Sequence, residues 1–147
     1  MSLLANAFGQ GAIAPSVEAA DWRQAIAASG AGLVASNCAT PEYTSAMIQA
    51  VEEMGPYIVI APGLALAHAR PGASVLKTGM SLAVLAQPVA FGNAANDPVS
   101  VVFGLAALDH DKHLELLAAF ANKASTVGFV NSLLSCGSEP NIRALLS

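Results

Sequence analysis

Several stretches of this 147-residue chain are almost continuously apolar, and this feature limits the possible folds more than any other. The clearest are Tyr57–Ala61 and Val99–Leu105, which are rich in β-branched and aromatic residues and leave no polar face for solvent. Strands of this kind are covered on both sides. They alternate with segments whose apolar residues have helical spacing. The alternation predicts an α/β layered sandwich, in which helices flank both sides of a mostly buried mixed sheet of about four to five strands.

Two helix starts can be read from capping residues. Ser16 is a plausible N-cap for a helix that begins at Val17, and Thr40 followed by Pro41 marks a stronger start. The expected helices are 17–28 with a weaker extension through its glycines to 34, 41–54, one that starts at Asp109 or Asp111, 129–134 and 140–146. The expected strands are 57–61, 64–67, 81–85, 89–91 and 99–105.

Composition favours one globular domain over residues 1–147. Apolar residues make up 54% of the chain and charged residues 11%, which is enough for a core and too little charge for disorder. The net charge is −4 without a cluster of Lys and Arg, so nucleic-acid binding is not expected. Gly, Ser, Asn, Gln and Pro interrupt the uncharged stretches, and the N-terminus lacks a basic region. We therefore expect neither a membrane helix nor a signal peptide, and a cytoplasmic protein.

The segment Gly55–Pro71 carries the best candidates for chemistry. After Pro62-Gly63, the apolar run Leu64–Ala67 leads to His68, which is followed by Arg70. An imidazole can attack phosphorus, and a guanidinium can bind phosphate oxygens in a fork, so the pair suits phosphoryl transfer. Taken alone, the residues leave simpler readings open. A histidine in an apolar run is more often a hydrogen-bonded core residue, and the arginine could be a solvated surface group.

A second pair of histidines, His110 and His113, lies at the expected helix start near Asp109 and Asp111. Their His-x-x-His spacing is compatible with metal ligation, but no further group of Cys or His supports a metal site. Cys38 and Cys136 have no metal or redox spacing and are most simply small buried thiols. The simplest reading of this second pair is a solvated helix start with capping aspartates.

The segment around His68 resembles the phosphorylation-site segment of type-2 enzyme IIA domains of the sugar phosphotransferase system. Members of the ascorbate branch read Gly-Pro-Tyr, a hydrophobic run, Ala-Pro-Gly, a second hydrophobic run and Pro-His-Ala-Arg-Pro. The resemblance covers roughly residues 15–120 and is far more specific than a lone motif. Its further matching positions are Trp22, Tyr43, Lys77-Thr78-Gly79, Phe91, Asn96-Asp97-Pro98-Val99 and His113-Leu114.

The resemblance implies a phosphoryl carrier, without metal or cofactor, for ascorbate or a related sugar. His68 would accept phosphate from phospho-HPr and pass it to a cysteine of a IIB component, which serves a membrane IIC transporter. His113 would orient His68 or donate to the phosphoryl group, Arg70 would help electrostatically, and His110 would be a surface residue. The negative net charge would suit a partner with basic residues, and the apolar composition permits a homodimer.

Two other readings stay open at this point. Some members of this family are regulators whose phosphorylated histidine controls binding to other proteins, and a relative could keep the fold without being phosphorylated. This chain departs from the family in two places. Ala67 stands where proline usually precedes the active histidine, which we expect to leave the loop freer. Val51-Glu52 replaces the Arg-Glu pair of mannitol- and fructose-type relatives, which favours the ascorbate branch.

Overall fold

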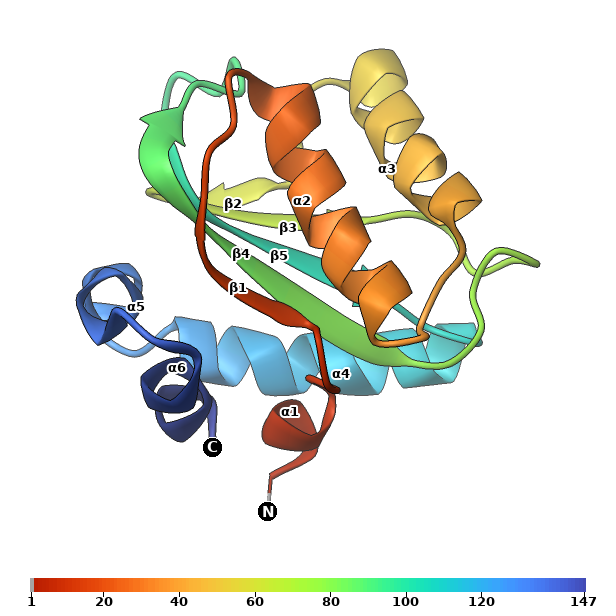
Figure 1. Cartoon of the computed structure of the whole chain (residues 1–147). Coiled ribbons are helices and arrows are strands. Elements are labelled where there is room, and N and C mark those ends of the chain that lie inside the picture. The colour runs from red at the N-terminus through yellow and green to blue at the C-terminus, as the bar shows by residue number, and fades with distance from the viewer. Residues whose placement is uncertain (1) are drawn as a thin grey trace.

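A five-stranded mixed sheet between two layers of helices forms the centre of the computed structural model, which describes residues 2–147 (Figure 1). Met1, the first residue of the expected leaderless N-terminus, lies outside these residues. The strand order is β1-β4-β5-β3-β2. The central strand β5 runs parallel to β3 and antiparallel to β4. The strands are β1 (Ile13–Val17), β2 (Val59–Ala61), β3 (Leu64–His68), β4 (Gly79–Val89) and β5 (Val99–Ala106).

Helices cover both faces of the sheet, as the predicted α/β sandwich requires. Side chains of β5 alternate between the two layers, with Val102 in the core under α2 and α3 and Phe103 in the opposite core. Figure 1 shows α2 and α3 on one face and the other helices on the opposite face. The helices are α1 (Leu3–Asn6), α2 (Trp22–Ala35), α3 (Pro41–Met54), α4 (His110–Ala124), α5 (Phe129–Cys136) and α6 (Glu139–Leu146).

The predicted start of the first long helix at Ser16 is wrong. Residues 13–17 form the edge strand β1, which pairs in parallel with β4. Asp21 caps α2 instead, because its carboxylate accepts the backbone N–H of Gln24 at 2.9 Å. The helix also continues through Gly30, where a Cβ atom would collide with Thr44 of α3, so the glycine permits close packing of the two helices.

Three predicted strands also differ from the structure. The expected strands 81–85 and 89–91 are not separate: β4 runs from Gly79 to Val89, residues 90 and 91 lie outside it, and its pairing with β5 shifts register between Val84 and Val89. Gln87 and Pro88 are exposed within this irregular part, and proline cannot donate to a ladder. The expected buried strand 57–61 is reduced to three residues at the sheet edge, β2.

Other expectations are confirmed. The helix α3 begins at Pro41 after the N-cap Thr40 and ends at Met54 before the C-cap Gly55, whose φ of 83° suits glycine. Asp109 caps α4 by accepting the backbone N–H of Lys112 at 2.8 Å. Leu116 and Phe120 form the buried stripe of α4, whereas Leu114 is half exposed.

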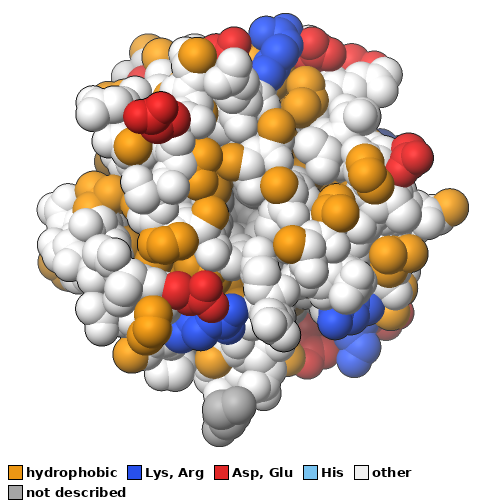
Figure 2. Space-filling view, viewed as in Figure 1, with side chains coloured by type: hydrophobic (Ala, Val, Ile, Leu, Met, Phe, Trp, Pro, Cys, Tyr) orange, Lys and Arg blue, Asp and Glu red, His pale blue; other side chains and the backbone are white. Residues whose placement is uncertain are grey.

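The surface and the thiols give further checks. Figure 2 shows one face of the molecule, on which the Lys and Arg side chains are separated by apolar and uncharged groups. No helix within residues 2–147 combines the length and the apolar character needed to cross a membrane. Cys38 is buried as expected, but Cys136 is only partly buried.

Candidate functional site

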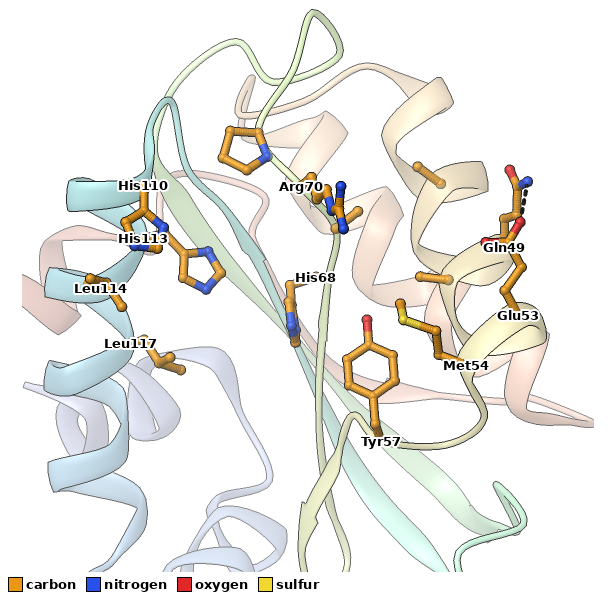
Figure 3. Close-up of a pocket in the computed structure, with 14 residues that line it drawn as sticks. Gln49, Glu53, Met54, Tyr57, His68, Arg70, His110, His113, Leu114 and Leu117 are labelled. Atoms are coloured by element: carbon orange, nitrogen blue, oxygen red, sulfur yellow. Dashed lines mark hydrogen bonds between the residues drawn. The ribbon is translucent and has the colours of Figure 1, made fainter.

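A cleft of about 810 Å³ lies between α3, the loop that follows β3, and the first two turns of α4 (Figure 3). It brings together His68, Arg70 and His113, the three residues expected to carry chemistry. His110, expected only at the surface, is exposed and lines the cleft as well. The other lining residues are Ala46, Gln49, Ala50, Glu53, Met54, Tyr57, Ala69, Pro71, Leu114 and Leu117.

His68 is the last residue of β3 and is partly exposed. Its Nδ1 lies 2.9 Å from the carbonyl oxygen of Leu66. A carbonyl can only accept a hydrogen bond, so Nδ1 must carry the proton of the neutral ring. The lone pair of the neutral imidazole therefore lies on Nε2. The backbone of β3 thus selects which nitrogen of His68 can act as a nucleophile.

His113 faces His68 from the first turn of α4, with the two ring centroids 5.6 Å apart and the planes at 62° (Figure 3). The helix start at the Asp109 cap places His113 at this point. Partial burial, followed by the nearby charges of His68 and His110, lowers the pKa of His113 below its usual value. His113 is therefore neutral at pH 7 and can donate a hydrogen bond without adding a positive charge beside His68.

Tyr57 covers another side of the His68 ring. The two ring centroids are 5.6 Å apart, and the planes are nearly perpendicular at 87°. Burial raises the pKa of Tyr57, so its hydroxyl keeps its proton at neutral pH. Tyr57 was expected in a buried strand, but it is 40% exposed in the structure. The preceding Gly55-Pro56 turn was the available signal that this residue leaves the sheet.

Arg70 is exposed and lines the same cleft two residues after His68. Within residues 2–147 the two ion pairs are Arg23–Glu52 and Arg143–Glu139, so neither involves Arg70. Its guanidinium is therefore available to an anion in the cleft.

The helix α3 forms the wall opposite α4. Gln49 donates a hydrogen bond from Nε2 to Oε1 of Glu53 at 2.9 Å along this wall (Figure 3). Of the pair that replaces Arg-Glu, Val51 is buried in the core and Glu52 pairs with Arg23 of α2 at 2.9 Å. Neither residue of this pair lines the cleft, so Arg70 is the arginine of the site.

The alanine that precedes His68 lies within a strand. Ala67 is fully buried in β3 and pairs in register with Gly104 of β5. The expectation that alanine leaves a freer loop is therefore wrong for this position, because the residue belongs to the sheet. Among residues 2–147, no three or more His, Cys, Asp and Glu side chains gather in a way that could hold a metal ion.

Comparison with protein families gives a match to the model of "Phosphoenolpyruvate-dependent sugar phosphotransferase system, EIIA 2" over residues 7–147. Among curated proteins, the chain is similar to the ascorbate-specific PTS system EIIA component of Escherichia coli K12. The two are 37% identical over 130 residues, which cover 88% of this chain and 84% of that protein.

Two solved structures are similar over almost the whole chain. One is the mannitol-specific cryptic phosphotransferase enzyme IIA CmtB of Escherichia coli, with a TM-score of 0.85, 33% identity and coverage of 98% of this chain and 97% of that one. The other is the enzyme IIA chain of the Escherichia coli mannitol system in complex with phosphorylated enzyme IIB. Its TM-score is 0.80 at 25% identity, and the match covers 94% of this chain and 95% of that one.

Proposed function

This chain belongs to the EIIA type-2 family of the phosphoenolpyruvate-dependent sugar phosphotransferase system, and we propose that His68 is the residue on which it carries phosphate. The donor would be phospho-HPr, and the acceptor a cysteine of a IIB component that serves a membrane IIC transporter. Because the curated relative is ascorbate-specific, the proposed substrate of the whole system is ascorbate or a related sugar.

The hydrogen bond from His68 Nδ1 to the Leu66 carbonyl is the observation that carries this proposal. In the first transfer, the lone pair of Nε2 forms a bond to phosphorus as the bond from phosphorus to the donor nitrogen breaks. The Nδ1 proton stays in place and is shared with the carbonyl. The phosphorylated ring then carries a positive charge, which the carbonyl dipole stabilises. The expected product is therefore an Nε2 phosphohistidine.

The second transfer reverses the first with sulfur as the nucleophile. A thiolate of the IIB cysteine attacks phosphorus, and the N–P bond breaks with its electron pair returning to Nε2 of His68. The ring is again neutral with its proton on Nδ1, so no net proton is gained or lost on His68 in the cycle. The same hydrogen bond to Leu66 therefore serves acceptance and release.

His113 and the start of α4 suit the charge that develops in the transition state. Negative charge spreads over the equatorial oxygens of the transferring group, so the protein contributes mainly positioning and hydrogen-bond donors. A neutral His113 can supply one N–H. The free backbone N–H groups at a helix N-terminus also favour an anion. Arg70 adds a cation two residues after the nucleophile.

The rim of the cleft suits transient docking of two carrier proteins. Met54 of α3 and Leu114 of α4 are 64% and 50% exposed on its opposite walls, and the half-exposed Tyr57 lines the same cleft. Exposed apolar groups around a small cleft are typical of interaction sites. A relative of this fold forms a complex with phosphorylated enzyme IIB, which supports a IIB partner here.

The test is transfer of labelled phosphate from phosphoenolpyruvate through enzyme I and HPr. Wild type should take up acid-labile label, and His68→Ala should take up none. His110→Ala, a second histidine at the same cleft, should keep the label. Label that persists in His68→Ala but is lost in His110→Ala would assign the phosphorylated residue to His110 instead of His68. Unlabelled wild type with a cognate HPr would contradict the carrier function.

Addition of a IIB protein separates transport from regulation. The IIB and IIC genes of a transport system usually lie together, so the cognate IIB is sought beside the gene for this chain. Labelled wild type should lose its phosphate to that IIB within one turnover. A labelled chain that no cognate IIB can discharge would favour the regulatory reading.

A further inference from the structure

The hydroxyl of Tyr43 lies between the carboxyl ends of β3 and β5. Tyr43 comes from α3 and is 1% exposed. Its Oη donates to the carbonyl oxygen of Leu105 at 2.7 Å and accepts the backbone N–H of Ala69 at 3.0 Å. The carbonyl oxygen of Ala69 is 3.1 Å away as well. One hydroxyl thus joins the residue after His68 to the end of the neighbouring strand.

The direction of the backbone groups in β3 shows which hydrogen bond this hydroxyl replaces. The N–H of Leu66 donates to the carbonyl of Ile58, on the β2 side of the strand. Successive N–H groups of a strand point to opposite sides, so those of Ala67 and Ala69 face β5. Ala69 is therefore oriented to continue the ladder with β5.

The parallel ladder between β3 and β5 ends at the pair His68–Leu105. In an uninterrupted parallel ladder, the N–H of Ala69 would donate directly to the carbonyl of Leu105. The Tyr43 hydroxyl is bonded to these same two groups and so takes the place of that bond. The chain consequently leaves the sheet immediately after His68 and enters the loop that carries Arg70.

On the basis of the proposed carrier function, we propose that Tyr43 is a positioning residue for phosphoryl transfer. Its hydroxyl ends β3 at His68 and fixes the course of the next two residues. His68 and Arg70 therefore face the same cleft. Tyr43 does not line this cleft, so it acts through the backbone of the loop and does not touch the phosphoryl group.

The start of α3 holds Tyr43 rigidly enough for this role. The N–H of Tyr43 donates to the carbonyl of Thr40, the N-cap, at 3.0 Å, and Pro41 fixes the first turn. Burial raises the pKa of Tyr43, so the hydroxyl remains a donor to Leu105 at any physiological pH. The loop after His68 is thus supported by α3. This support does not need the proline that usually precedes the active histidine of the family.

Hydrogen exchange of the wild-type protein gives a first test that needs no variant. The amide of Ala69 should exchange about a hundredfold or more slowly than that of Arg70, its neighbour in the loop, because only the former is bonded to Tyr43. Equal, unprotected exchange of the two amides would overturn the proposal.

The variant Tyr43→Phe removes the hydroxyl and keeps the buried ring. We expect the maximal rate of phosphate transfer from phospho-HPr to fall about ten- to a hundredfold, with less than about a twofold change in the half-saturating donor concentration. The matched control is Ser81→Ala, which removes another buried hydroxyl, bonded to the Ser29 carbonyl at 2.6 Å, away from the cleft. It should lower the unfolding temperature and leave the transfer rate unchanged.

The outcomes separate this proposal from the carrier function. If wild type takes up no label, the carrier function fails, and Tyr43 is then judged by the His68 ring nitrogens in NMR spectra. These should show a less populated Nδ1–H form in Tyr43→Phe. If wild type is labelled and Tyr43→Phe reacts at the same maximal rate, Tyr43 has no positioning role. An equal loss of rate in Ser81→Ala would assign the effect to stability and also overturn the proposal.

Discussion

Two loops at opposite ends of β5 are held in different ways. Before β5, the turn Asn93–Asp97 is organised by its own residues, because the Asp97 carboxylate accepts the backbone N–H groups of residues 91–93 at 2.9 to 3.1 Å. Beside the other end of β5, the loop after His68 is held at Ala69 by Tyr43, which lies 26 residues earlier in the chain.

The difference separates local from tertiary control of structure. The Asp97 turn is ordered mainly by contacts between residues four to six apart. The Asn93 and Asn96 side chains add bonds to the carbonyl oxygen of Val59 at 3.3 and 3.2 Å. The His68 loop needs α3, β3 and β5 to be assembled before its partner is present. Mutations in the first loop should therefore change stability, whereas mutations around the second should change phosphoryl transfer.

The largest effect that we expect from this contrast is on transfer in His113→Ala. Removal of one well-placed donor to a transition-state anion costs about a hundredfold in rate. The expected result is a labelling rate about a hundredfold below wild type, with a small change in unfolding temperature. Rapid-quench labelling from phospho-HPr and thermal unfolding measure the two quantities.

Glu115→Ala is the matched control for His113→Ala, because Glu115 is exposed on the same helix and does not line the cleft. It should label as fast as wild type. A His113→Ala protein that labels at the wild-type rate but unfolds at a much lower temperature would place His113 with the structural residues and break the contrast between the two loops.

The next largest effect is on stability in Asp97→Ala. Loss of the carboxylate leaves three backbone N–H groups without their acceptor, and the free energy of unfolding should fall by about 2 kcal/mol. Urea unfolding measures this change, again beside Glu115→Ala, which removes the same charge. Below the unfolding transition, labelling of His68 should stay within about threefold of wild type. A hundredfold slower transfer would mean that the two loops are coupled.

The same contrast explains which features could be predicted from sequence. The helix start at Thr40-Pro41 and the turn ending at Asp97 depend on neighbouring residues, and the helix start was predicted from those residues. The strand at residues 13–17 was missed because its partner is β4, almost 70 residues later. No local signal in this segment indicates that pairing, so the Ser16 helix start was the stronger local pattern.

The residues of the site likewise fall into those that a local sequence pattern indicates and those that depend on tertiary contacts. His68 was found because it stands in a conspicuous apolar run bounded by Pro and Gly. Its approach to His113, 45 residues later, could be expected only from the family resemblance, since no spacing rule connects the end of β3 with the start of α4. The bond of Tyr43 to Ala69 depends on where β3 ends. That end is set by tertiary contacts and has no signature in the residues around it.

The smallest expected effect is a dependence of stability on pH, which measures whether His113 is partly buried beside His68 in the folded chain. Folding lowers the pKa of His113, so the unfolded chain binds a proton near pH 6.5 that the folded chain binds only at lower pH. Within that interval the unfolded state holds more protons, and stability must rise with pH. This contribution is fully present above about pH 6.5 and is lost as the pH falls below it.

The unfolding temperature of wild type should therefore drop more than that of His113→Gln between about pH 7.5 and pH 5. All other titrating groups are common to both proteins and largely cancel in the comparison. If the unfolding temperatures of the two proteins change in parallel with pH, His113 is no more buried in the folded chain than in the unfolded one. That result would contradict its position in the wall of the cleft.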